Sequence, residues 1–491
     1  MKFDFLGRER ELKQLENLWV SPHAEFLILY GRRRVGKTAL LVEWIRRSKQ
    51  RAIYWVATHT SAANQLRSFS QIIYNFAYPG APAPKEFSYA SWEQAFQFVA
   101  TLAEKERLAL FMDEFTYLLE VTPDIAGKLQ NLWDHLLSKR NLFLCISGSH
   151  LGMMKREFFS YQAPLYGRAS SQIYLRPFTF GATARFFPNY SAVDRVAVYA
   201  IFGGIPAYWE RINPDKNISQ NIRDNLLTSN NLLQVEPKLL LQDFVSDPHN
   251  YISILSAIAN GAHVNKEIVA RTGLASGHVS KYLSVLIDSG FVERRVPVTV
   301  QKSSRAGRYH ITDPYLRFYF RFLEDRKEQL ALGIQEQALA EISRHLIDFI
   351  GTYTWEEICR EWTIRAGANG ELPYMPDQVG SVWNAKAQVD VVGYNSMQKT
   401  LILGECKWTR SPVKAGVLDN LITEKAEHVI PKSGQWQVFF TVFSRSGWSS
   451  GALEQEKQIK TNLPSGYNWS ASGIRLIDLA QVDRDLQDWT N

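Results

Sequence analysis

Eight consecutive residues near the start of the chain have the spacing of a phosphate-binding loop. Residues 31–38 read GRRRVGKT and fit the pattern G-x-x-x-x-G-K-[ST] at each position. The glycines let backbone N–H groups surround phosphate oxygens, and the N-terminus of the following helix adds positive potential. Lys37 is expected to reach the β- and γ-phosphates of ATP, and Thr38 to bind Mg²⁺. The residues predicted to bind the nucleotide are Gly31, Arg32, Arg33, Arg34, Val35, Gly36, Lys37 and Thr38.

Two carboxylates follow a later apolar run and complete this chemistry. The run LALFMDE ends in Asp113 and Glu114. Asp113 is expected to bind the Mg²⁺ with Thr38, and Glu114 to polarise the water that attacks the γ-phosphate. Ser147 and Ser149 end the next apolar run, where a hydroxyl can contact this water or the γ-phosphate. The alternative for these serines is helix capping at a strand–helix turn.

A third group of residues suits metal-dependent cleavage of a phosphodiester. Asp390 lies in an apolar run, Glu405 and Lys407 end the next run in GECKW, and Glu356 lies upstream in a helical pattern. Hard carboxylates bind Mg²⁺ or Mn²⁺, and a lysine two residues further along a strand can stabilise the charge on the reacting phosphate. A helix glutamate, a strand aspartate and E-x-K on the paired strand form the order of the PD-(D/E)xK nuclease core.

The E-x-K triplet is weak evidence by itself, because it also occurs at Glu11 and at Glu236. Only the copy at Glu405 ends an apolar β pattern and follows a strand with an aspartate. A buried Asp390 is costly without a cation or a hydrogen-bonding partner. Lys425, on the next helix, is a further candidate for contacting a phosphate. We therefore predict an endonuclease site that binds its metal through Glu356, Asp390 and Glu405; the alternative is a domain that keeps the fold without an active metal site.

These residues need an α/β framework to position them. Short apolar runs alternate with amphipathic stretches in the first 178 residues, which is typical of buried parallel strands separated by helices. The predicted strands lie at residues 24–31, 51–58, 108–115, 141–149 and 171–178. A helical pattern follows from 179 to 241, and strands in QVDVVGYN, TLILGECKW and QWQVFFTVFS mark a final α/β region.

The region between these parts resembles a DNA-binding module in its pattern and charge. Residues 250–312 show three short helical patterns and then a hairpin, the order of a winged helix-turn-helix. Between residues 261 and 310 there are eight Lys and Arg against three Asp and Glu, a surplus of five that points to a polyanion. His278, Ser280 and Lys281 begin the predicted recognition helix. The arginines expected to contact the DNA backbone around the wing are Arg294, Arg295, Arg305 and Arg308. The alternative is a winged helix that only packs against protein.

Composition limits the class of protein further. The chain has 491 residues, 45% hydrophobic and 21% charged, which favours a globular protein of several domains. Its three cysteines are far apart, so we expect neither a disulfide scaffold nor a structural zinc site. The charged start and the absence of a long apolar run predict no signal peptide, no membrane partner and a cytoplasmic location.

Several segments together resemble the archaeal-type ATPases, a branch of the AAA+/STAND P-loop proteins. These segments are FLGRERELKQLENLW, LYGRRRVGKTALL, LFMDEF, and PLYGR followed by LRPF. The resemblance implies that the acidic strand is not beside the P-loop strand, and that residues 5–8 pack near the adenine. It implies that Arg168 is an arginine finger acting within a homo-oligomer, although an ordinary surface arginine is the alternative. It also implies that Pro206, in a G-x-P motif, senses nucleotide from the lid.

The same resemblance extends to the end of the chain, because such ATPases often carry a C-terminal restriction-endonuclease-like domain similar to WEEICREW, VDVV and GECKW. The expected domains are a P-loop ATPase core at 1–178, a helical lid at 179–245, a winged helix-turn-helix at 246–312, a connecting helix at 313–339 and a PD-(D/E)xK domain at 340–491. The expected function is ATP-dependent DNA processing with Mg²⁺. The alternative is a nucleotide switch of the STAND type that binds DNA or protein without cutting.

Overall fold

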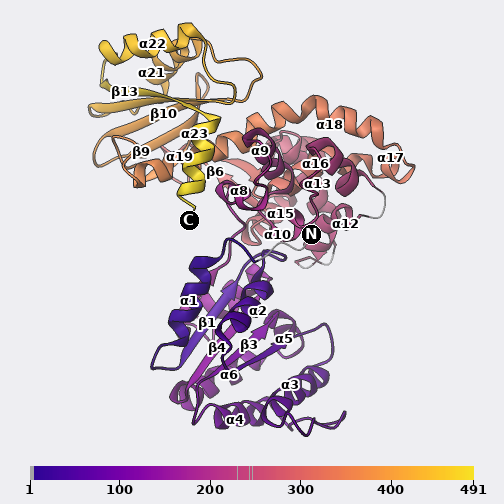
Figure 1. Ribbon diagram of the computed structural model, residues 1–491. Coiled ribbons are helices and arrows are strands. Elements are labelled where there is room, and N and C mark those ends of the chain that lie inside the picture. Colours follow the sequence, from indigo (N-terminus) through magenta and orange to yellow (C-terminus); the bar gives the residue numbers. More distant parts are fainter. Residues whose placement is uncertain (1–4, 229–230, 243, 246, 491) are drawn as a thin grey trace. The chain divides into compact units, whose positions relative to one another are not determined.

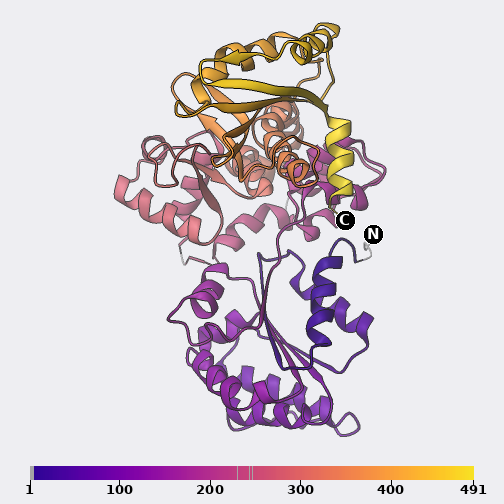
Figure 2. The same ribbon diagram turned by 90° about the vertical axis from the view of Figure 1, so that its left-hand side faces the viewer.

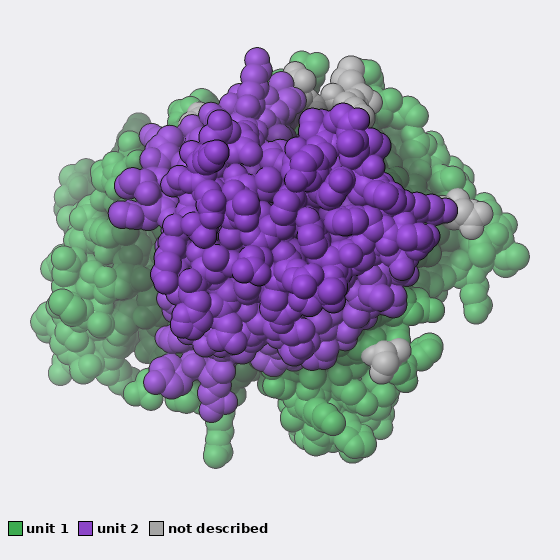
Figure 3. All heavy atoms as spheres, turned by 90° about the horizontal axis from the view of Figure 1, so that it is seen from below, with its two compact units in different colours: residues 1, 178–204, 208–491 green, residues 2–177, 205–207 purple. Residues whose placement is uncertain are grey.

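The structure is a computed structural model that describes residues 5–228, 231–242, 244–245 and 247–490. It consists of two compact units, coloured separately in Figure 3. Unit 2 comprises residues 2–177 and 205–207, and unit 1 comprises residues 1, 178–204 and 208–491. The predicted boundaries within unit 1 stay predictions.

Unit 2 is built on a five-stranded sheet whose paired strands all run parallel. The strands are β1 (Glu25–Tyr30), β2 (Ala52–Val56), β3 (Leu108–Asp113), β4 (Leu142–Gly148) and β5 (Ser171–Tyr174). Their order is β2-β3-β4-β1-β5, so β4 separates the acidic strand β3 from β1, which precedes the P-loop. Every residue of β3 and β4 is buried, as expected for apolar runs covered on both faces. The predicted parallel P-loop sheet is therefore confirmed.

Helices cover both faces of this sheet (Figures 1 and 2). They are α1 (Glu9–Trp19), α2 (Lys37–Ser48), α3 (Ala62–Ala77), α4 (Trp92–Leu102), α5 (Phe115–Val121), α6 (Ile125–His135) and α7 (Leu151–Met154). On one face, Trp44 of α2 packs with Leu27 of β1 in a buried cluster. On the other face, Phe96 of α4 belongs to the cluster that contains Ile28. Because neighbouring residues of β1 point to opposite faces, one apolar strand anchors both helical layers.

The first part of unit 1 is helical and contains α8 (Thr183–Phe186), α9 (Ala192–Phe202), α11 (Ile218–Ile222) and α12 (Leu232–Gln242), while α10 (Pro206–Trp209) begins in unit 2. Next come α13 (His249–Ala259), α14 (Asn265–Thr272), α15 (Ser276–Asp288), β6 (Val292–Arg295) and β7 (Arg308–Ile311). β6 and β7 pair antiparallel, so three helices precede a hairpin as the sequence predicts. Gly273 ends α14 with a φ of 70°, a left-handed turn that favours glycine.

Four helices lead into the C-terminal sheet: α16 (Pro314–Phe322), α17 (Lys327–Ala331), α18 (Gln335–Phe349) and α19 (Glu356–Ala368). The sheet strands are β8 (Gln378–Trp383), β9 (Gln388–Asn395), β10 (Thr400–Lys407), β11 (Trp436–Ser444), β12 (Ser465–Gly466) and β13 (Trp469–Asp478). Their order is β12-β13-β11-β10-β9-β8, with β8, β9 and β10 antiparallel and β10, β11 and β13 parallel. Further α-helices in this part are α20 (Gly416–Asp419), α21 (Ala426–Val429), α22 (Ser450–Thr461) and α23 (Leu479–Asp488).

Candidate functional site

The P-loop connects β1 to α2 at the carboxyl edge of the parallel sheet. Its backbone needs glycine at both ends. A Cβ at Gly31 would lie 2.4 Å from the carbonyl oxygen of Leu175, and Gly36 has a φ of 100°. Gly36 also lies beside the predicted sensor residue Pro206, whose Cγ would be 3.8 Å from a Cβ at Gly36. The motif glycines are thus required by the local packing as well as by phosphate binding.

Lys37 is buried and held by the loop itself. Its Nζ donates to the carbonyl oxygens of Gly31 at 3.0 Å and Arg32 at 3.3 Å. Burial lowers the pKa of Lys37, and the nearby carboxylates of Glu114 and Asp113 oppose that shift. The loop therefore presents a preorganised positive charge next to the acidic end of β3.

Asp113 accepts hydrogen bonds from hydroxyl groups of three elements. Its Oδ2 accepts from Thr38 Oγ1 at 2.6 Å and from Tyr54 Oη at 2.7 Å, while its Oδ1 accepts from Ser147 Oγ. The carboxylate is buried, and the backbone N–H of Glu114 also donates to it at 2.9 Å. Thr38 and Asp113 come together as the sequence predicts, and their oxygen atoms are ligands that suit Mg²⁺.

Glu114 follows in a left-handed conformation with a φ of 50° at the start of α5. Its Oε2 accepts from Ser149 Oγ at 2.7 Å. The two predicted serines therefore contact the two carboxylates. Neither serine caps α7, because the side chain of His150 accepts the hydrogen bond from the N–H of Met153 at 3.1 Å. The helix-capping alternative is thus wrong for both.

Sequence reasoning missed Tyr54. Nothing in the sequence marks this tyrosine of β2, because only the order of the strands brings β2 beside β3. Burial and the carboxylate of Asp113 raise the pKa of Tyr54, so the phenol stays protonated and donates to Asp113.

Tyr54→Phe is expected to raise the Mg²⁺ concentration for half-maximal ATP hydrolysis by about fivefold, the scale of about 1 kcal/mol for one lost hydrogen bond. Without the phenol, the Asp113 carboxylate loses one of the groups that fix its orientation. Phosphate release measured over a Mg²⁺ titration checks this. Tyr161→Phe, at a residue 85% exposed, is the matched control. An unchanged Mg²⁺ dependence in Tyr54→Phe would contradict the role.

Two further residues of the ATPase unit make structural contacts. Arg168 donates to both carboxylate oxygens of Asp134 and to the carbonyl oxygen of Pro164. As placed, this arginine is bound within its own unit; the finger role in an oligomer stays a prediction. Arg8, in the segment predicted near the adenine, donates to the carbonyl oxygens of Val35 at 3.1 Å and Arg176 at 2.8 Å. This segment therefore braces the P-loop.

The C-terminal sheet brings together Asp390, Glu405 and Lys407 of the third predicted group. Asp390 Oδ2 accepts from the backbone N–H of Cys406, which lies between Glu405 and Lys407, at 3.1 Å. Glu405 is buried, and its carboxylate binds Lys407 Nζ at 3.0 Å and Lys425 Nζ at 2.6 Å. Burial and the carboxylate of Glu405 raise the pKa of Asp390. The two other E-x-K copies lie in helices α1 and α12, so only this copy lies on a strand beside an aspartate.

Helix α19 adds a third carboxylate. Burial and the charge of Asp390 raise the pKa of Glu356 to about 8. The pKa of the adjacent Glu357 shifts in the opposite direction. Burial alone would raise it, but Arg317 and Arg295 lower it to about 2. Among the described residues, no group of three or more His, Cys, Asp or Glu side chains is arranged to hold a metal ion.

Three of the four wing arginines predicted to contact DNA also make contacts within unit 1, and their role at DNA stays a prediction. Arg295 pairs with Glu293 and with Glu357, at 2.7 Å to the latter. Arg294 donates to carbonyl oxygens of its own wing. Arg308 lies 4.7 Å from the ring centre of Trp383 on β8. Of these arginines only Arg295 is paired with carboxylates of the described residues, and Arg294 and Arg305 are exposed.

The recognition helix keeps its predicted exposure. His278, Ser280 and Lys281 of α15 are all exposed, while Val279 and Leu283 face the core.

Across the described part of the chain, no helix is both long and apolar enough to span a bilayer.

A P-loop followed by an acid on a non-adjacent parallel strand defines unit 2 as a P-loop ATPase fold. Residues 5–212 match the family described as an ATPase domain predominantly from Archaea, so the chain carries an archaeal-type ATPase domain. Residues 250–296 match the IclR helix-turn-helix domain, which confirms the predicted helix-turn-helix. Residues 319–424, which include Glu356, Asp390 and Glu405, match a family of archaeal and bacterial proteins of unknown function.

Individual relatives agree with this assignment. An uncharacterized protein of Methanocaldococcus jannaschii is 29% identical over 411 residues, 82% of this chain and 87% of that protein. An uncharacterized ATP-binding protein of the same organism is 47% identical over 45 residues, 9% of this chain and 76% of that protein. A Walker-type ATPase of Pyrococcus abyssi is similar in structure with a TM-score of 0.50 and 18% identity, over 65% of this chain and 96% of that chain. This last similarity concerns the fold.

Proposed function

We propose that the protein is an ATP-controlled DNA-processing enzyme whose C-terminal domain cleaves DNA with a divalent metal ion. One observation carries the proposal: Asp390, Glu405 and Lys407 meet at the ends of two paired strands, with Glu356 on the helix beside them. This is the set of side chains and the order of elements that phosphodiester cleavage by a PD-(D/E)xK site requires.

The type of these side chains suits Mg²⁺ or Mn²⁺, although no three carboxylates of the described residues are arranged around one ion as placed. Three carboxylates share a buried region, and the pKa values of Asp390 and Glu356 are raised by burial and by a neighbouring carboxylate. Such repulsion favours a divalent cation, which Glu356, Asp390 and Glu405 would hold. When bound, the ion would supply an activated water and charge stabilisation at the phosphate. Burial alone would lower the pKa of Lys407, but Glu405 raises it, so this lysine stays a cation that can face phosphate.

Binding of duplex DNA is assigned to α15, whose His278, Ser280 and Lys281 are exposed. Lys281→Ala is expected to weaken duplex binding and to reduce the slope of log affinity against log salt concentration by slightly less than one unit. Fluorescence anisotropy with a labelled duplex at several salt concentrations measures both. Lys457→Ala on α22, also an exposed lysine, is the matched control. If Lys281→Ala keeps the wild-type affinity and slope, the winged helix is a protein-packing module.

A second function, a nucleotide switch without cleavage, has one observation in its favour. Both lysines, Lys407 and Lys425, bind the Glu405 carboxylate, which leaves it charge-neutralised without a metal ion. The two functions are separated by incubating the full chain with single-stranded, duplex and branched DNA. Cleavage that needs Mg²⁺ or Mn²⁺ and stops with EDTA supports the nuclease. No cleavage under any of these conditions, with and without ATP, supports the switch.

A further inference from the structure

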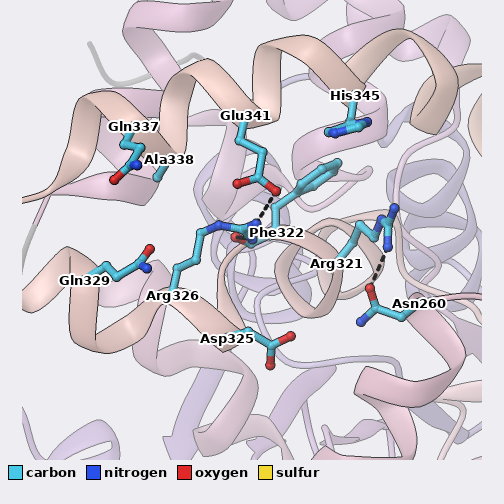
Figure 4. Close-up of a pocket in the computed structure, with 10 residues that line it drawn as sticks. All are labelled: Asn260, Arg321, Phe322, Asp325, Arg326, Gln329, Gln337, Ala338, Glu341 and His345. Carbon is cyan, nitrogen blue, oxygen red and sulfur yellow. Dashed lines mark hydrogen bonds and ion pairs between the residues drawn. The ribbon is translucent and has the colours of Figure 1, made fainter. Parts of the chain in front are cut away.

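Unit 1 contains two hollows with opposite electrostatic character. The first lies between α16, α17 and α18 and has a volume of about 340 Å³ (Figure 4). Its arginines are held by its own walls: Arg326 pairs with Glu341, and Arg321 donates to Asn260. Asp325 adds a second acid. The charges in this hollow are balanced, so it offers no excess charge to a ligand.

The second hollow lies between the wing and the edge of the C-terminal sheet and has a volume of about 480 Å³. The end of β8, the end of α21 and Val264 line it, together with these residues of the wing: Pro297, Thr299, Val300, Arg305, Ala306 and Arg308. Its charged or titratable lining residues are Arg305, Arg308 and His428, and among the described residues that line it none is acidic. The remaining lining is largely apolar, with valines and Trp383.

This hollow is rigidly built. The backbone N–H of Val298 donates to the carbonyl oxygen of Ser381 at 3.1 Å, which ties the wing to the edge strand β8. The indole Nε1 of Trp383 donates to the carbonyl oxygen of Ala306 at 3.1 Å, and Arg308 lies over the ring. Both the aromatic ring and a guanidinium are therefore held in place before a ligand arrives, which reduces the entropic cost of binding.

The hollow is also close to the proposed cleavage site along the strand. Trp383 is the register partner of Gln388 on β9, and Asp390 follows Gln388 by two residues. Arg308 donates to the Gln388 side chain at 3.4 Å. A nucleotide bound here would place its neighbouring phosphates next to the strand that carries Asp390.

From these observations we propose that the hollow binds one unstacked nucleotide of single-stranded DNA. Trp383 and Arg308 form a stack that a base extends, the valines contact the base and sugar, and Arg305 attracts the phosphate. The size of the hollow matches small-ligand sites of about 300–1,000 Å³. Duplex DNA keeps its bases stacked, so it gains none of these contacts. The inference rests on the proposed role in DNA processing and names the form of DNA that the site selects.

The test measures binding in EDTA, so that it does not depend on cleavage. The probes are a single-stranded 12-mer oligodeoxynucleotide with one 2-aminopurine, and its duplex. We expect Trp383→Leu to weaken single-strand binding about tenfold, the scale of one lost base–aromatic stack. The change in 2-aminopurine fluorescence on binding should disappear, and duplex binding should stay unchanged. Val300→Glu, at a residue 44% exposed, adds a negative charge to the lining and is expected to act in the same direction. It serves as the second variant if Trp383→Leu fails to fold.

Lys302→Ala, at an exposed residue of the wing outside the lining, is the control for general electrostatic attraction. The inference is overturned if Val300→Glu and Lys302→Ala weaken single-stranded and duplex binding equally, because the wing is then only a basic patch. It is also overturned if folded Trp383→Leu binds the single strand like the wild type. Selective single-strand binding in a protein that never cleaves DNA would contradict the nuclease proposal and support the nucleotide site.

Discussion

Glu114→Gln is expected to slow ATP hydrolysis by about a hundredfold or more while ATP still binds. The amide keeps the size of the side chain and an oxygen that can accept from Ser149 Oγ, but it can no longer polarise the attacking water. Asp113 and Thr38, the residues predicted to hold Mg²⁺, are untouched. Phosphate release measures hydrolysis, and isothermal titration calorimetry measures nucleotide affinity.

Two comparisons sharpen this experiment. Lys37→Ala removes the buried ammonium next to the loop carbonyl groups and should abolish binding itself, so the two variants fail at different steps. Glu120→Gln, at a half-exposed glutamate of α5, is the matched control for the amide change and should hydrolyse ATP normally. If Glu114→Gln hydrolyses ATP at the wild-type rate, another residue polarises the attacking water.

Asp390→Asn should reduce metal-dependent DNA cleavage by at least about a hundredfold. Even mutation of residues that only hydrogen-bond to a metal ligand lowers metal affinity or activity by up to about that factor. The amide keeps an oxygen to accept from the Cys406 N–H but loses the charge that holds the cation. Mn²⁺ binding measured by calorimetry should weaken in parallel, while ATP hydrolysis stays normal. The cleavage readout is nicking of a supercoiled plasmid.

Lys407→Gln should lower cleavage on a similar scale for a different reason. The lysine is a cation and cannot bind a metal ion while it is protonated, so its loss removes charge stabilisation from the reacting phosphate. Because Lys407 also binds Glu405, its removal should leave Mn²⁺ affinity unchanged or increase it. Glu11→Gln, in a helical E-x-K copy, should cleave normally. Loss of Mn²⁺ binding in Lys407→Gln would show that the lysine organises the site instead.

Local patterns in the sequence were sufficient for the elements that carry the chemistry. The P-loop, the acid at the end of β3 and the parallel strands follow from glycine spacing and from apolar runs, because backbone conformation and burial depend on residues close in sequence. The same holds for the three helices and the hairpin of the winged helix. The strand order, with β4 between β1 and β3, was expected from the family resemblance and not from the apolar runs.

Contacts between distant segments required the tertiary structure. The sequence predicts Glu356 as a metal ligand, but only the packing shows how it differs from the adjacent Glu357. Burial and Asp390 raise the pKa of Glu356, whereas Arg317 and Arg295 lower that of Glu357 against the effect of burial. The wing shows the same limit. Its arginines have the composition of a DNA contact, yet Arg295 pairs with Glu357 of α19. A basic residue has the same sequence signature whether its partner is a phosphate or a buried carboxylate, because both recognise the same charge. The tertiary structure decides which of these two partners lies beside the basic residue.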